Sequence, residues 1–142
     1  MKTRNPENSV LYLTPAMGVM AVAVMAVAAD GHWKQREIER LRMMTYLQPM
    51  FRDIPSVERF IADRAAELRL VGPKVLIEDC RKALTPRLRE TAYAWAAELV
   101  QADGYVGTSE HVFLQELAET FKIPGQLARK IQAVVAIRRR TA

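Results

Sequence analysis

A short acidic turn that occurs twice is the strongest constraint on how this chain can fold. Ala28-Ala29-Asp30-Gly31 is followed by Glu37, and Gln101-Ala102-Asp103-Gly104 is followed by Glu110 at the same spacing. Asp-Gly is a turn-forming pair, because glycine accepts positive φ and aspartate bonds its own backbone. Each copy therefore ends one periodic segment and begins another, and the repetition predicts an internal duplication.

The segments on either side of each turn read as helices. Thr14-Pro15 and Thr85-Pro86 both place a capping residue before a proline at the first helical position. The helix from Pro15 to about Ala29 is built of Ala, Val and Met with no polar face, which is typical of a helix at the centre of a core. Polar helices follow the turns, over about 34–47 and 109–121.

The first apolar run also has a membrane interpretation. Residues 10–29 are 20 positions without a charge, about the length of a bilayer span, and a signal peptide cleaved near Ala28 would fit the small residues there. Gly18 and the Thr14-Pro15 pair interrupt the run, and cleavage would remove one helix of the repeat. We therefore expect a buried helix.

Breaks at Pro49, Gly72-Pro73 and Pro124-Gly125 separate the remaining helices. The sequence predicts an all-α fold of about seven helices, with a pseudo-two-fold arrangement of repeats at about 13–72 and 84–138. Residues 74–83 form a short connecting helix. Residues 1–12 are expected to be a flexible arm, and residues 13–142 a single domain.

The repeated carboxylates allow two interpretations. Aligned with a calcium-binding loop, each turn keeps only the last aspartate and the closing glutamate, whereas calcium prefers six to eight oxygens. Two half-loops facing each other could supply four carboxylates: Asp30, Glu37, Asp103 and Glu110. The structural interpretation is that the aspartates form turns and the glutamates complement helix N-termini. From the residues alone the structural interpretation is favoured, because it explains every position.

The sequence carries few signals of catalysis, zinc binding or nucleic-acid binding. No nucleophile–base pair, phosphate-binding loop or zinc spacing occurs, so we expect no enzyme activity. Cys80 follows the apolar spacing of Leu76 and Leu84, which indicates a small buried side chain. The histidines, His32 and His111, occupy different positions in the two copies and are expected at the surface. The net charge of +5 is modest and dispersed, apart from the arginines at 138–140, so no nucleic-acid partner is expected.

The duplicated Ala-Asp-Gly turn with its glutamate resembles the TerB tellurite-resistance family, over roughly residues 10–138. The resemblance implies an all-helical, pseudo-two-fold domain of a cytoplasmic stress-response protein that acts beside membrane-associated partners. It also implies an acidic metal-binding patch, which would fall on the four carboxylates, with calcium as the favoured ion. The chain departs from this pattern at 34–36, where Lys-Gln-Arg crowds the first carboxylate pair, and in its unusually apolar first helix.

These observations predict a non-enzymatic module that binds a divalent metal or a protein partner through its Asp-Gly turns. One alternative is a peripheral membrane-associated adaptor at the inner face of the membrane, docking through its apolar surface and the arginines at 138–140. A metal-assisted hydrolase is the weaker alternative, since it needs an open coordination position and a placed base.

Overall fold

The computed structural model describes residues 12–31, 33, 35–102 and 106–141. Within these residues the chain is all-α, as predicted, and contains no strand. The elements are α1 (Pro15–Ala28), α2 (Gln35–Leu47), the 3-10 helix η1 (Pro49–Phe51), α3 (Val57–Ala83), α4 (Pro86–Val100), α5 (Thr108–Phe121) and α6 (Gly125–Arg138).

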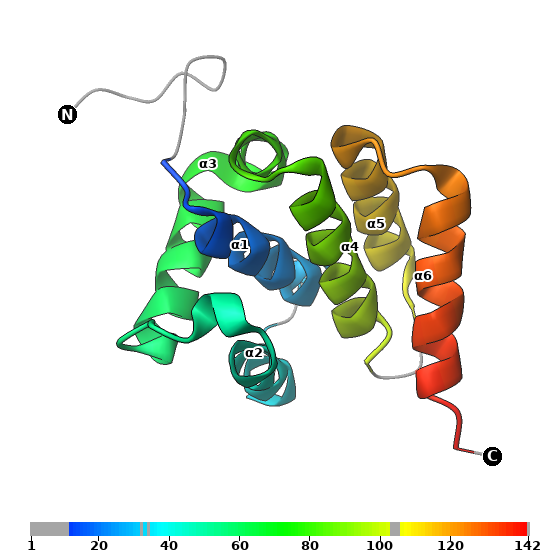
Figure 1. The fold of residues 1–142 in the computed structure, drawn as a ribbon, viewed down its shortest axis with the longest axis horizontal. Coiled ribbons are helices and arrows are strands. Elements are labelled where there is room, and N and C mark those ends of the chain that lie inside the picture. The colour runs from blue at the N-terminus through cyan, green and yellow to red at the C-terminus, as the bar shows by residue number, and fades with distance from the viewer. Residues whose placement is uncertain (1–11, 32, 34, 103–105, 142) are drawn as a thin grey trace.

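The expected number of about seven helices is wrong for the described residues, which form six α-helices. The helix expected over 74–83 is present, but it is counted within α3, which consists of two helical segments joined across a kink. Gly72 interrupts that helix with φ 80° and ψ 165°, and Pro73 follows. This conformation is essentially restricted to glycine. The chain bends steeply there, so that Figure 1 shows the first segment of α3 along the page and the second nearly end-on.

The helix starts follow the predicted capping chemistry. The backbone N–H of Met17 donates to Thr14 Oγ1 at 3.2 Å, and that of Leu88 donates to Thr85 Oγ1 at 3.3 Å. Ser56 caps α3 in the same way. Each hydroxyl satisfies a backbone donor that has no partner inside its helix, which typically stabilises a helix by about 1 kcal/mol.

The apolar helix α1 lies at the centre of the molecule. Its side chains from Val19 to Val24 are fully buried, and it packs chiefly between α3 and α4 (Figure 1). Because partners surround it, α1 has no need of a polar face. Among the described residues, no helix combines the length and the apolar character that a membrane crossing requires.

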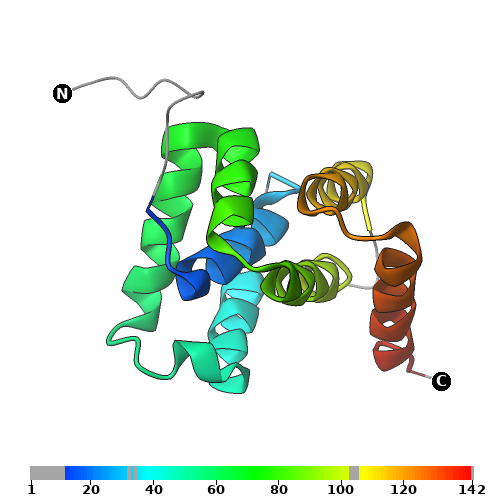
Figure 2. The same ribbon diagram turned by 45° about the horizontal axis from the view of Figure 1, so that its top comes forward.

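The helix α4 connects the core to the last two helices. It packs on α1 and also on α5 and α6, as Figure 2 shows. The helix α6 is the least enclosed, with only Ala128 and Val135 buried. Val134 follows the apolar spacing of Leu127 and Ile131, which predicts an inward position, but it is 56% exposed. The internal duplication stays a prediction.

Candidate functional site: the two acidic turns and their arginines

The first turn is closed by its own backbone. The N–H of Gly31 donates to the carbonyl of Ala28 at 2.9 Å, and Gly31 has φ +79°. A side chain there would have free space around it but a strained backbone. Asp30, just before the glycine, is partly buried. The local structure therefore explains the Asp-Gly pair without a ligand.

Glu37 lies in the first turn of α2 and is 8% exposed. It is on the inward side of that helix, in register with the fully buried Leu41 and Met44. A carboxylate at this position is stabilised by the helix dipole. Because it is nearly buried, Glu37 is part of the structure around the turn and not a solvated surface charge.

The second turn begins with the N–H of Ala102, which donates to the carbonyl of Leu99 at 3.3 Å. Asp103 and Gly104 lie outside the described residues. Glu110 Oε1 accepts a hydrogen bond from the N–H of Gly107 at 2.9 Å. Hydroxyl side chains are favoured caps, which predicts Thr108 or Ser109 for this helix. The cap is instead Gly107, whose backbone N–H donates to the side chain of Glu110.

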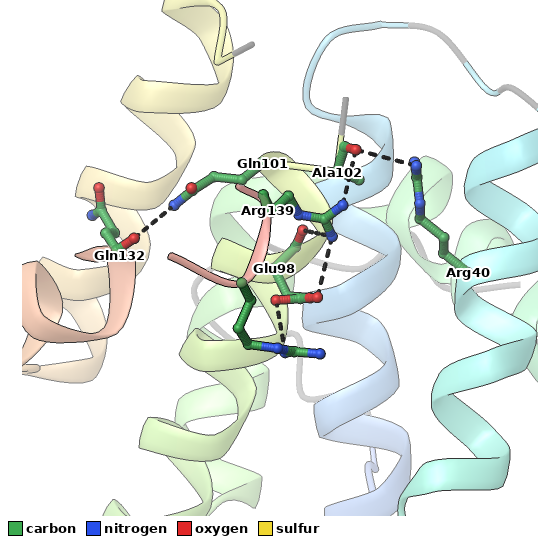
Figure 3. Close-up of polar contacts among 7 residues, drawn as sticks. Arg40, Glu98, Gln101, Ala102, Gln132 and Arg139 are labelled. Carbon is green, nitrogen blue, oxygen red and sulfur yellow. Dashed lines mark hydrogen bonds and ion pairs between the residues drawn. The ribbon is translucent and has the colours of Figure 1, made fainter. Parts of the chain in front are cut away.

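The described structure brings α2 to the second turn. Arg40 on α2 donates from Nη2 to the carbonyl of Ala102 at 3.2 Å. Arg139, just after α6, donates to the same oxygen from Nη1 at 3.0 Å. Figure 3 shows both guanidinium groups at this carbonyl, Arg40 from the side of α2 and Arg139 from below. The backbone directly before Asp103 is thus held by one arginine from α2 and one from the C-terminal end of α6.

Arg139 is also bound to Glu98 on α4. Its Nη2 donates to the Glu98 carbonyl at 3.2 Å and to Glu98 Oε1 at 3.1 Å. Arg138 pairs with the other oxygen, Oε2, at 3.1 Å. Sequence reasoning assigned the arginines at 138–140 to the helix dipole or to a docking tail. The structure gives Arg139 a different role, because it fastens the end of α6 to the end of α4.

A second set of polar contacts fixes α6 beside α4 (Figure 3). Gln101 donates to the carbonyl of Gln132 at 3.4 Å, and the Gln132 side chain donates to the hydroxyl of Tyr93 at 2.8 Å. Tyr93 is almost fully buried, and this burial raises the pKa of its phenol, with the Gln132 hydrogen bond partly offsetting the effect. Such buried contacts hold α6 in one register.

The structure describes three of the four candidate metal ligands. Asp30, Glu37 and Glu110 are described, and Asp103 lies outside the described residues. Within the described ranges, no group of three or more His, Cys, Asp or Glu side chains could hold a metal ion. His111 is exposed, as expected, and His32 lies outside the described part. The shared metal site stays a prediction.

Two further sequence expectations concern reactivity and packing. Cys80 is fully buried, and burial raises the pKa of its thiol, which makes it unreactive as a nucleophile. Trp95 follows the apolar spacing of its helix, which predicts a core position; it is partly buried and packs against the core. It lines a cleft of about 490 Å³ between α4 and α6, together with Ile131, Val134 and Arg138. Trp33 follows the first Asp-Gly pair at the position that Val106 has in the second copy, which predicts that it seals the first turn onto the core, but it is 44% exposed.

Comparison of the chain with the models of known protein families, with curated proteins and with solved structures found no match.

Proposed function

We propose that this chain is a non-enzymatic, TerB-like module that binds a divalent cation through its two Asp-Gly turns. The observation that carries the proposal is the hydrogen bond from Arg40 to the carbonyl of Ala102. It places α2, which carries Glu37 one helical turn away, against the backbone next to Asp103. This closeness of α2 to Ala102 supports the proposal, because a shared ion requires the two turns to lie near each other.

The oxygen atoms at the two turns are of the type that binds a hard cation. Carboxylate and carbonyl oxygens are the ligands that calcium and magnesium prefer. Two features would limit affinity. One carboxylate oxygen of Glu110 already accepts a hydrogen bond from the N–H of Gly107. Arg40 also brings a positive charge to the same region. An ion would have to compete with that guanidinium, so binding is expected to be weaker than in a full calcium loop.

Calorimetric titration of calcium, magnesium, manganese and zinc into metal-free protein tests the proposal. We expect heat and a higher melting temperature with at least one ion, lost in Asp103→Asn and in Glu37→Gln. Asp63→Asn is the matched control, because Asp63 is an exposed aspartate on α3. Neither heat nor a melting shift with any ion would eliminate the metal proposal.

A substrate panel tests the non-enzymatic part of the proposal. Metal-dependent turnover that disappears in Asp103→Asn would instead support a metal-assisted hydrolase.

A second candidate function is docking to an anionic membrane surface, as a peripheral adaptor. The segment 122–142 contains six Lys and Arg residues and no Asp or Glu, although the whole chain has a net charge of only +5. Val134 and Ile137 are exposed on the same helix, at 56% and 51%. Basic residues flanking exposed apolar side chains favour attachment to anionic lipid.

Vesicle sedimentation separates this candidate from metal binding. We expect binding to phosphatidylglycerol-containing vesicles, but not to phosphatidylcholine vesicles, and weaker binding at high salt. Replacing Lys130 and Arg140 together by glutamine should weaken it. The same change at Arg52 and Arg59, two exposed arginines in and before α3, is the control. Equal losses for the two pairs would mean that net charge, and not α6, controls binding.

A further inference from the structure

A second groove, of about 450 Å³, lies in the first half of the molecule. Its lining comes from α1 through Val24, from α2 through Ile38, and from the first segment of α3. Trp33, which precedes α2 in the chain, also lines it. Val24 is fully buried and Ile61 is 4% exposed, so the deep part is apolar. Trp33, at 44% exposed, lies where the groove opens to solvent. This volume is in the range of small-molecule sites.

Three charged side chains also line the groove. Arg42 Nη1 from α2 pairs with Glu58 Oε1 from α3 at 2.8 Å. Arg69, one residue beyond the apolar Leu68, is exposed. In the described part of the chain Arg69 has no ion pair. The lining therefore combines apolar side chains with one guanidinium whose charge is not balanced by a carboxylate.

We propose that this groove binds a single-chain amphiphile with an anionic head group, of which a fatty acid is the simplest example. The alkyl chain would lie against Val24, Ile61 and Leu68, which removes chiefly its own apolar surface from water. The carboxylate would bind Arg69, since a guanidinium matches carboxylate geometry. The groove is too small for a protein helix, and its charge disfavours a cationic ligand.

The two tryptophans of the chain give a direct assay. Trp33 lines this groove, whereas Trp95 lines the cleft between α4 and α6. Monomeric sodium dodecanoate should therefore change the fluorescence of Trp95→Phe, in which Trp33 is the reporter, saturably and with one site. It should leave Trp33→Phe unchanged. Each methylene removed from the chain should weaken binding about fourfold, so octanoate should bind far more weakly.

Variants test the head group and the groove separately. Arg69→Gln should weaken dodecanoate binding about tenfold without affecting dodecanol, whereas Arg129→Gln, an exposed arginine on α6, should change neither. Ala62 is exposed and lines the groove, so Ala62→Phe should fill it without disturbing the core and should abolish binding. Circular dichroism checks that each variant folds.

Three results would overturn the proposal. The first is the absence of saturable binding in calorimetry and fluorescence. The second is equal affinity for dodecanoate in Arg69→Gln and the parent chain, which would leave only an unspecific apolar surface. The third is a ligand response from Trp95 and not from Trp33, which would place the amphiphile in the other cleft.

Discussion

Arg138 and Arg139 are adjacent, bind the same carboxylate of Glu98 and are expected to differ widely in their contribution to stability. Arg139 is 26% exposed and makes three hydrogen bonds, one to the carbonyl of Ala102 and two to Glu98. Arg138 is 65% exposed and makes one ion pair. An exposed ion pair contributes about 0 to 1 kcal/mol, because water screens it and ordering the side chain costs entropy.

The loss for Arg139→Gln can be bounded from its contacts. Hydrogen bonds to charged groups contribute about 1.5 to 3 kcal/mol each, and solvent exposure reduces this. Two of the three acceptors keep a partner, since Arg40 still bonds the Ala102 carbonyl and Arg138 still pairs with the Glu98 carboxylate, whereas the Glu98 carbonyl loses its hydrogen bond from Arg139. We therefore expect Arg139→Gln to cost about 2 to 3 kcal/mol and Arg138→Gln less than about 0.5 kcal/mol.

Urea denaturation followed by circular dichroism measures both variants. With an m-value of about 1 to 2 kcal/mol/M, the midpoint of Arg139→Gln should fall by about 1 to 3 M, and that of Arg138→Gln by less than about 0.5 M. Equal losses for the two arginines, or a loss below about 0.5 kcal/mol for Arg139→Gln, would refute the assignment of Arg139 as the fastening between α4 and α6.

Three further outcomes follow from the core and the backbone. Gly72→Ala should cost about 1 to 3 kcal/mol in chemical denaturation, because alanine is strained at φ 80°; an unchanged midpoint would contradict the break in α3. Val22→Ala should cost about 2 to 3 kcal/mol by the same measurement, since Val22 is fully buried. Burial raises the pKa of Cys80 from 9.0 and that of Tyr93 from 10.0. The unfolded chain then releases these protons first, so the free energy of unfolding should fall as pH rises above about 9, by up to about 1.4 kcal/mol per pH unit for each group. Cys80→Ala should flatten that slope, and the native thiol should resist alkylation until the chain unfolds.

The helical framework was accessible from sequence because its signals are local. Thr14 and Thr85 each precede a proline, and both cap the predicted helices. The break at Gly72 was also visible, but its geometry was not, since one residue can end a helix or redirect it within a continuous segment. The sequence did not predict the cap at Gly107, because Gly107 has no side chain of its own. Its backbone N–H instead donates to the side chain of Glu110.

The site was less accessible, because its contacts join residues far apart in the chain. The convergence of Arg40 and Arg139 on Ala102 depends on how α2 and α6 pack, and spacing within either helix carries no trace of it. Charge composition suggested only a basic tail at 138–140. The exposure of Val134 was likewise invisible, since periodicity finds the apolar face of a helix but not how far a neighbour covers it.

The enclosure of α1 has a consequence for how the molecule opens. Its backbone amides can exchange with solvent only when α3 and α4 separate, which requires disruption of the whole core. The helix α6, with two buried side chains, can detach chiefly by losing its contacts with α4. Backbone amides should therefore exchange most slowly in the middle of α1 and fastest in α6. Amides next to Ala102, which Arg40 and Arg139 hold, should exchange at intermediate rates.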